Sequence, residues 1–113
     1  TGPSGDHLKA LWAAWGIADA MAAKAVQAPP GVPVARLVAE GAADLGLQQV
    51  SELIGQPGIA LITDLPEAVQ AETVFTGGVA ATARHAVRAA AVLAWLASKD
   101  IAPILHRHGM APA

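Results

Sequence analysis

Apolar residues near the start of the chain recur at the spacing of a helix. Leu8, Leu11, Trp12 and Trp15 are three or four positions apart. This spacing places their side chains on one helical face, so we expect a helix of about three turns. Ser4 lies just ahead of this stripe as a candidate N-cap, and the next glycine, which follows the last tryptophan, is expected to end the helix.

Further helices are predicted wherever apolar positions keep this period between capping and breaking residues. Pro33 suits the start of a helix whose apolar stripe ends before Gly41. Thr82 and Asp100 are candidate caps of two later helices. In all, helices beyond the first are expected over residues 17–23, 33–40, 51–54, 82–96 and 100–107.

Short apolar runs bounded by glycine, proline and polar residues predict strands between these helices. The runs are residues 24–27, 45–47, 59–63 and 73–80. Alternation of short helices with such strands is typical of an α/β layer fold. The sequence therefore predicts an α/β fold with a small, mainly parallel sheet and flanking helices.

Composition narrows the function classes. The 113 residues carry a net charge of -2 and contain no cysteine. Without a cluster of Lys and Arg we expect no nucleic-acid partner, and without Cys there is no disulfide, thiolate nucleophile or Cys-type zinc site. Hydrophobic residues make up 54% of the chain, but every apolar run is shorter than the roughly 20 residues of a membrane span. The chain starts without Met or a targeting segment, so we expect that an upstream part has been removed.

Neutral polar groups at the predicted ends of helices and strands form a candidate ligand site. Gln48 and Gln49 follow a predicted strand, at the end where open α/β sheets bind ligands. Helix starts offer further donors through a hydroxyl and free backbone N–H groups. The candidate ligand-binding residues are Ser4, Gly5, Gly31, Val32, Gln48 and Gln49. Together they predict a site for a small anion held without Lys or Arg.

The other chemically capable side chains have structural explanations. His106 and His108 are two apart near a helix end, where they suit the terminal carbonyls. At this spacing they point in different directions on a helix, so we do not expect them to share a metal. No phosphate loop, nucleophile elbow or nucleophile–base pair is present in the sequence. We therefore expect no catalytic residue, no metal, no cofactor and no enzymatic activity.

An ordered series of short motifs carries a resemblance to a known family. The motifs are Pro3-Ser4-Gly5, Trp15-Gly16-Ile17, the segments 38–46 and 48–52, Leu65-Pro66, Thr73-Val74-Phe75, and the closing segment from Leu96 to Met110. In this order and spacing the chain resembles the carboxyl-terminal half of the molybdate-type periplasmic solute-binding proteins of ABC importers. The resemblance runs nearly end to end, although no single motif is diagnostic.

The resemblance implies a two-lobed class II periplasmic binding protein that closes on a tetrahedral oxyanion such as molybdate or tungstate and delivers it to a membrane permease. Residues 1–72 would be the second lobe, and residues 73–113 the crossover strand and helices that complete an absent first lobe. The implied ligand contacts match Ser4, residues 31–32 and Gln49. The best-known members carry Tyr where this chain has Gln49, so the anion is left open. A periplasmic or otherwise exported location is also implied.

Two other functions fit the same sequence. The two-lobed architecture also serves as the effector-sensing domain of transcription regulators, and an α/β interaction module without a small ligand is the third possibility. For the chain as a fragment, the predicted helix face of Val87, Ala91 and Trp95 would lose its partner sheet. We expect this surface to be hidden by a homodimer or by a segment swap with a second copy.

Overall fold

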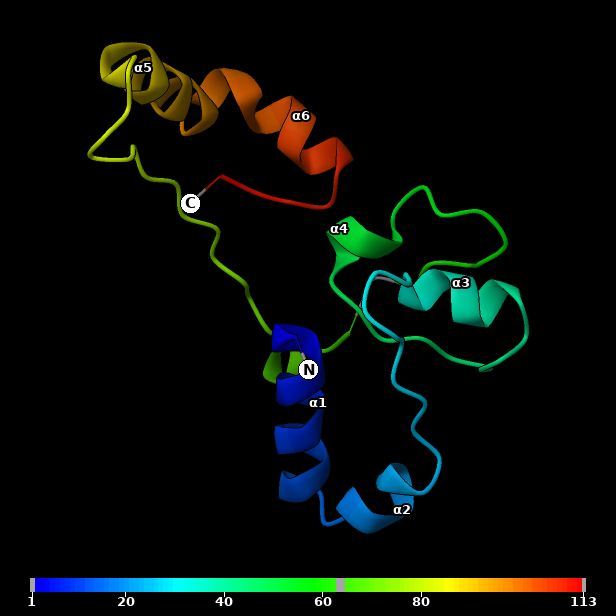
Figure 1. The fold of residues 1–113 in the computed structure, drawn as a ribbon. Helices are drawn as coiled ribbons and strands as arrows, with labels where there is room; N and C mark the ends of the chain where they lie inside the picture. The colour runs from blue at the N-terminus through cyan, green and yellow to red at the C-terminus, as the bar shows by residue number, and fades with distance from the viewer. Residues whose placement is uncertain (1, 63–64, 113) are drawn as a thin grey trace. The chain divides into compact units, whose positions relative to one another are not determined.

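The computed structural model describes residues 2–62 and 65–112, which belong to two compact units, Thr1–Glu72 (unit 1) and Thr73–Ala113 (unit 2). The helices of unit 1 are α1 (Pro3–Ala14), α2 (Ala18–Ala22), α3 (Val34–Ala39), α4 (Val50–Leu53) and the 3-10 turn η1 (Glu67–Val69). Those of unit 2 are α5 (Ala86–Leu96), η2 (Lys99–Ile101) and α6 (Ala102–Arg107). Figure 1 shows these elements joined by segments without regular structure.

The prediction of an α/β fold with a mainly parallel sheet is wrong, because none of the described residues lies in a strand. The predicted strands at 24–27, 45–47 and 73–80 are irregular, as are residues 59–62; Thr63 falls outside the described residues. A strand needs the N–H and C=O groups of a neighbouring strand. In the described part of the chain, backbone hydrogen bonds outside the helices join residues at most five positions apart, so these runs find no such neighbour.

Helix α1 forms where the apolar period predicts it. Leu8, Leu11 and Trp12 are half-buried on one side, and α1 contacts α2. Pro3 occupies the first turn, where its missing N–H costs nothing, and the N-cap is Gly2. Gly16 has φ +69° and ends the helix. The expected cap at Ser4 is therefore wrong, since Ser4 is already the second residue of the helix.

The chain folds tightly around α3. Ala35 is buried, with 2% of its surface exposed. A Cβ placed at Gly46 would lie 2.8 Å from a methyl group of each of Val34 and Val38, and one at Gly58 would lie 2.9 Å from the Cβ of Ala39. Because these two backbone segments approach α3 so closely, only glycine fits at either position without a shift. This packing sets the path of the chain on both sides of α4.

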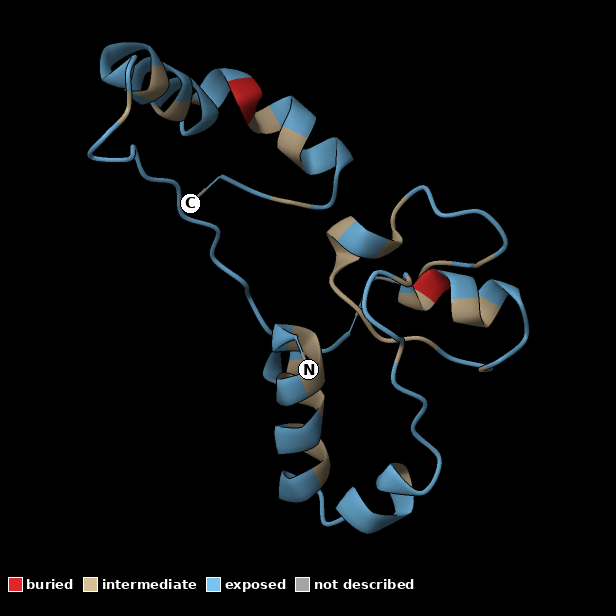
Figure 2. Cartoon of the chain, viewed as in Figure 1, coloured by how far each residue is buried: buried red, intermediate tan, exposed pale blue. Residues whose placement is uncertain are grey.

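Unit 2 contains α5, followed along the chain by η2 and α6. The long helix begins at Ala86, four residues after the predicted cap at Thr82, and no side chain caps it. Asp100 lies within η2 rather than capping α6. Ile101 is buried at 4% exposure, and Gly77 lies against Leu93 of α5. Figure 2 marks buried residues in red and shows how few of them the described chain contains.

Candidate functional site

Three of the predicted site residues meet in unit 1. Ser4 Oγ, in the first turn of α1, donates a 2.5 Å hydrogen bond to Gln48 Oε1. The backbone N–H of Gln49 donates to the same oxygen at 3.2 Å. All three residues are partly buried. We call them the Ser4–Gln48–Gln49 cluster. It joins the side chains of Ser4 and Gln48, 44 positions apart, and the backbone N–H of Gln49 into one group of neutral hydrogen-bonding groups.

The cluster forms because each member lies at a helix start. Ser4 is the second residue of the 12-residue helix α1, whose first N–H groups have no partner within the helix. Its hydroxyl is not used as a cap, so it is available to Gln48. Gln49 is the N-cap residue of α4, with φ -58° and ψ 141°. The two glutamines therefore precede a short helix, and they do not follow a strand as predicted.

Gly5 continues the first turn of α1 and is partly buried. Its contribution to a site would be its backbone N–H, which lies among the N-terminal donors of a long helix. Such donors carry partial positive charge and suit an anion. The role of Gly5 as a ligand contact stays a prediction.

The remaining predicted contacts, Gly31 and Val32, form a turn before α3. Gly31 has φ +77°, which favours glycine, and the N–H of Val32 donates to Pro29 O at 3.0 Å. That amide is therefore already used within the turn. Helix α3 is only six residues long and starts two residues later, so its dipole offers an anion little. Within the described contacts nothing joins this turn to the Ser4–Gln48–Gln49 cluster.

His7 is a polar side chain of unit 1 that is not among the predicted site residues. Its Nε2 lies 3.0 Å from Val69 O. Because a carbonyl oxygen only accepts, Nε2 is the donor, and in a neutral ring Nδ1 is then the nitrogen with a free lone pair. The signal that points to His7 is its position three residues after Ser4, on the same side of α1.

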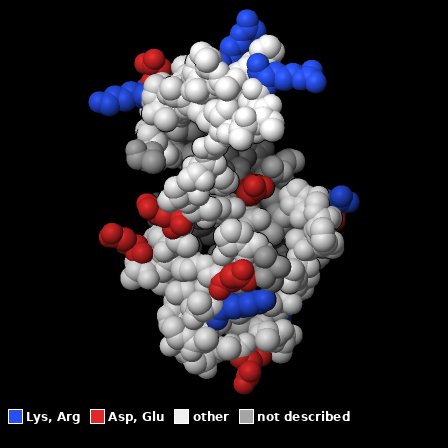
Figure 3. Space-filling view, turned by 60° about the vertical axis from the view of Figure 1, so that its left-hand side comes forward, with Lys and Arg blue, Asp and Glu red and all other residues white. Residues whose placement is uncertain are grey.

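Charged side chains take little part in the described contacts of unit 1. The ion pair between Arg36 Nε and Glu40 Oε1, 2.7 Å apart, lies one turn apart on the exposed side of α3. The hydrogen bond from Arg36 to this carboxylate raises the pKa of the guanidinium, which stays charged at any physiological pH. On the face drawn in Figure 3, acidic and basic side chains form small groups separated by uncharged surface. The side chains of the Ser4–Gln48–Gln49 cluster itself carry no charge.

Two further types of feature are absent from the described residues. No group of three His, Asp or Glu side chains there has the arrangement to hold a metal ion. In the same part of the chain, no helix is long and apolar enough to cross the membrane.

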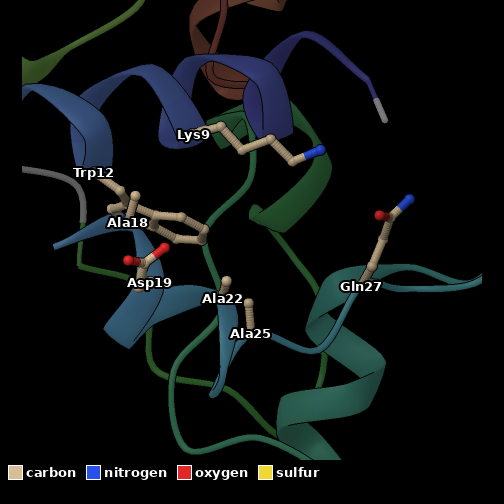
Figure 4. Close-up of a pocket in the computed structure, with 7 residues that line it drawn as sticks. All are labelled: Lys9, Trp12, Ala18, Asp19, Ala22, Ala25 and Gln27. Carbon is tan, nitrogen blue, oxygen red and sulfur yellow. The ribbon is translucent and has the colours of Figure 1, made fainter.

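A separate cavity of about 390 Å³ lies between α1 and α2. Figure 4 shows the Trp12 ring over the α2 side of the cavity, with Asp19 below it. Its lining residues are Lys9, Trp12, Ala18, Asp19, Ala22, Ala25 and Gln27. None of them belongs to the Ser4–Gln48–Gln49 cluster, so the cavity does not enlarge that site.

Comparison with known proteins supplies the context of the site. The family model of bacterial extracellular solute-binding proteins matches residues 1–111. A curated protein from Pseudomonas sp, aconitate isomerase, is 40% identical over 83 residues, which are 74% of this chain and 32% of that protein. The chain thus spans about a third of the length of this relative. No solved structure matches the chain.

These findings confirm one part of the sequence interpretation and correct another. The resemblance to solute-binding proteins is confirmed at the level of the family, whereas the molybdate type is not distinguished. The expectation that the chain has no enzymatic role is wrong as it stands, because a relative at 40% identity is an isomerase and therefore an enzyme.

Proposed function

We propose that this chain, which belongs to the family of bacterial extracellular solute-binding proteins, supplies one side of a binding site for a small anion. The observation that carries the proposal is the hydrogen bond from Ser4 to Gln48, which brings a hydroxyl at the start of α1 to the amides before α4. Hydroxyl, amide and helix N–H donors can hold an anion without a Lys or Arg counter-charge.

We assign the ligand contacts to Ser4, Gly5, Gln48 and Gln49. The single O–H of Ser4 donates to Gln48 Oε1 in this structure, so a bound anion would have to take this hydrogen bond over from Gln48. The Oε1 atom of Gln48 accepts from both neighbours, so its own side-chain NH₂ is left to face a ligand. Residues 1–72 are then the ligand-binding lobe, and residues 73–113 the part that returns to the other lobe. The opposite side of the site belongs to the rest of a longer protein, of which this chain is about a third by the length of its relative.

We favour a carboxylate of the aconitate class as the anion. The 40% identity with aconitate isomerase is a direct match over 83 residues, and a carboxylate oxygen accepts from hydroxyl and amide donors. The alternative is a tetrahedral oxyanion such as molybdate or tungstate, which the motif resemblance implies. In that case the full-length protein would pass its ligand to the membrane permease of an ABC importer, from the periplasm or another exported location.

A second function, conversion of the bound anion, follows from the same relative. A base can interconvert the isomers of an unsaturated tricarboxylate by taking a proton from its CH₂ carbon and returning that proton to the former alkene CH carbon as the double bond shifts. A histidine with a free ring nitrogen is the commonest group for such a transfer. His7 fits that role because its Nε2 is engaged with Val69 O, which leaves Nδ1 available on the helix that carries Ser4. In this version the Ser4–Gln48–Gln49 cluster holds a carboxylate while His7 handles the proton.

Calorimetry of the full-length parent with trans-aconitate, citrate, molybdate, tungstate and sulfate tests the binding proposal. We expect heat with trans-aconitate, and at least about tenfold weaker binding in Ser4→Ala and Gln49→Ala, since a hydrogen bond to a charged group contributes about 1.5–3 kcal/mol. Ser98→Ala is the matched control, because that hydroxyl bonds to Trp95 O in unit 2. Silence with every anion, or wild-type affinity in Ser4→Ala, would refute it.

Proton NMR of the parent with cis- or trans-aconitate separates conversion from binding. A His7→Gln variant keeps a polar side chain there but lacks a base. Loss of conversion with retained binding supports the second function. Binding without conversion in the wild type would refute the second function and retain the first, which is anion binding.

A further inference from the structure

A single oxygen atom in unit 1 accepts hydrogen bonds from two donors of the proposed site. Gln48 Oε1 accepts from the hydroxyl of Ser4, in the first turn of α1, and from the backbone N–H of Gln49, the N-cap residue of α4. The second contact fixes the orientation of the Gln48 amide, because a backbone N–H only donates and must therefore face the oxygen and not the NH₂ group. Two donors that would suit a ligand are thus bonded to the chain itself.

A ligand can use the Ser4 hydroxyl only by replacing this oxygen. The hydroxyl has one hydrogen to donate, and that hydrogen is directed at Gln48. The side chain of Gln48 is able to give way, because the residue is only partly buried and no hydrogen bond of the described residues holds its NH₂ group. Its two bonds to Ser4 and Gln49 are therefore what keeps the amide oxygen in place.

We propose that Gln48 is an internal competitor at the anion site of the proposed function, on which this inference rests: its amide oxygen holds the place of one ligand oxygen until an anion replaces it. The exchange favours an anion because charge-assisted hydrogen bonds are roughly twice as strong as neutral ones. A neutral ligand oxygen would only exchange one neutral acceptor for another. Binding of any ligand is weakened by the two hydrogen bonds that it must replace.

Displacement changes the role of the Gln48 amide from acceptor to donor. Once its oxygen has left Ser4 and Gln49, a half-turn about the last side-chain bond brings the NH₂ group toward the same position. The anion then meets three donors, which are the Ser4 hydroxyl, the Gln49 N–H and the Gln48 NH₂. A carboxylate only accepts, so it matches a site made of donors alone.

A carboxylate built into the chain tests the proposal without any added ligand. Gln48→Glu in the 113-residue chain places an ionised oxygen at the position of the amide oxygen. Because two donors bond to the charged form, NMR titration of the introduced carboxyl should give a pKa below the ordinary Glu value of about 4.3. The extra stability of this variant should be present above that ordinary pKa and be lost as the pH falls through the lowered pKa. The matched control is Gln56→Glu at an exposed position of unit 1, whose carboxyl should keep the ordinary pKa.

Other titratable groups on the two helices could also shift this pKa. They are Asp6, His7 and Lys9 on α1 and Glu52 on α4. The carboxylates would raise it, whereas Lys9 and a histidine, which is cationic at acidic pH, would lower it. The lowered pKa should therefore persist in a background of His7→Gln with Lys9→Gln, and move toward the ordinary value in a Ser4→Ala background.

A double-mutant cycle of binding tests the competition in the full-length parent. In the wild type, Ser4→Ala removes a bond to the ligand and also a bond to the competitor, so the two losses partly cancel. In Gln48→Met no competitor is present, and Ser4→Ala should weaken trans-aconitate binding by a factor at least about threefold larger than in the wild type. If Gln48 instead served to position the Ser4 hydroxyl, the factor would be smaller in Gln48→Met.

The two experiments separate this inference from the proposed function. An unshifted carboxyl in Gln48→Glu, a shift that Ser4→Ala leaves unchanged, or an equal or smaller factor in Gln48→Met would overturn the inference, even where the parent binds trans-aconitate. Silence of the parent with every anion would refute the proposed function, and the pKa in Gln48→Glu would still decide whether this position takes an ionised oxygen.

Discussion

Removal of the Ser4 hydroxyl tests whether the Ser4–Gln48–Gln49 cluster holds unit 1 together. Ser4→Ala deletes one neutral hydrogen bond, and such bonds contribute about 0.5–1.5 kcal/mol net. Gln48 Oε1 keeps the N–H of Gln49 at 3.2 Å, so no buried acceptor loses its last partner. We therefore expect the free energy of unfolding of unit 1 to fall by about 1 kcal/mol and not by the larger cost of an unpaired group.

A double-mutant cycle isolates the contact itself. Gln48→Met keeps the length of the side chain without its acceptor, and the pair of single variants and the double variant should give a coupling energy of about 0.5–1 kcal/mol. Urea unfolding would be followed by tryptophan fluorescence in a Trp95→Phe background, because Trp12 and Trp15 then report on unit 1 alone. Ser98→Ala in unit 2 should leave this transition unchanged. A coupling energy of zero within error would refute the contact.

Two glycine comparisons test the close packing with matched pairs. Gly58 and Gly55 have φ +78° and +74°, so replacing either by alanine should destabilise unit 1 by about 1–2 kcal/mol through backbone strain. Gly58→Ala should destabilise it more than Gly55→Ala, because the new Cβ would lie 2.9 Å from a Cβ of α3. Equal urea midpoints for the two would contradict that contact. In unit 2, Gly77→Ala would place a Cβ 2.6 Å from Leu93 Cδ2 and should destabilise Trp95-monitored unfolding by about 1 kcal/mol, whereas Gly78→Ala meets nothing within 4 Å and should not. No difference between those two would show that Leu93 moves aside freely.

The helices were largely predictable because their signals are local. The apolar stripe of α1 and the stop at Gly16 lie within one segment. The structure confirms the stop and the stripe as far as Trp12, whereas Trp15 is the C-cap and is 54% exposed. The same holds for the helix after Pro33 and its end at Gly41, which has φ +74°. The start of α5 was harder to predict. Thr82 has the side chain of a typical N-cap, but residues 80–83 form a turn ahead of the helix.

Whether the apolar runs form strands could not be predicted from the local sequence pattern. Residues 59–62 and 73–80 have the apolar and β-branched character of strands, yet a strand exists only when a distant segment supplies its hydrogen bonds. Apolar character shows that a segment favours burial. It does not show that a partner lies beside it.

The site was predictable in its parts and not in its connections. Ser4, Gln48 and Gln49 stand out as neutral polar residues at element ends, but their meeting across 44 positions is a property of the packing of unit 1. The local pattern also predicted the wrong role for Ser4. A hydroxyl at the start of α1 could serve either as an N-cap or as a partner for Gln48, and the sequence does not distinguish the two. The same applies to Val32, whose N–H is taken by its own turn.

Burial determines how well the site of unit 1 can hold an anion. Neutral donors hold an anion well only where water is excluded, because the same hydrogen bonds are weak in a high-dielectric surrounding. Ser4, Gln48 and Gln49 are only partly buried in this chain. An anion at the cluster would therefore keep much of its water, and its affinity would come from whatever closes over the cluster from the other side. If the proposed function holds, the isolated chain should bind trans-aconitate far more weakly than the full-length parent, and equal affinity of the two would refute this reasoning.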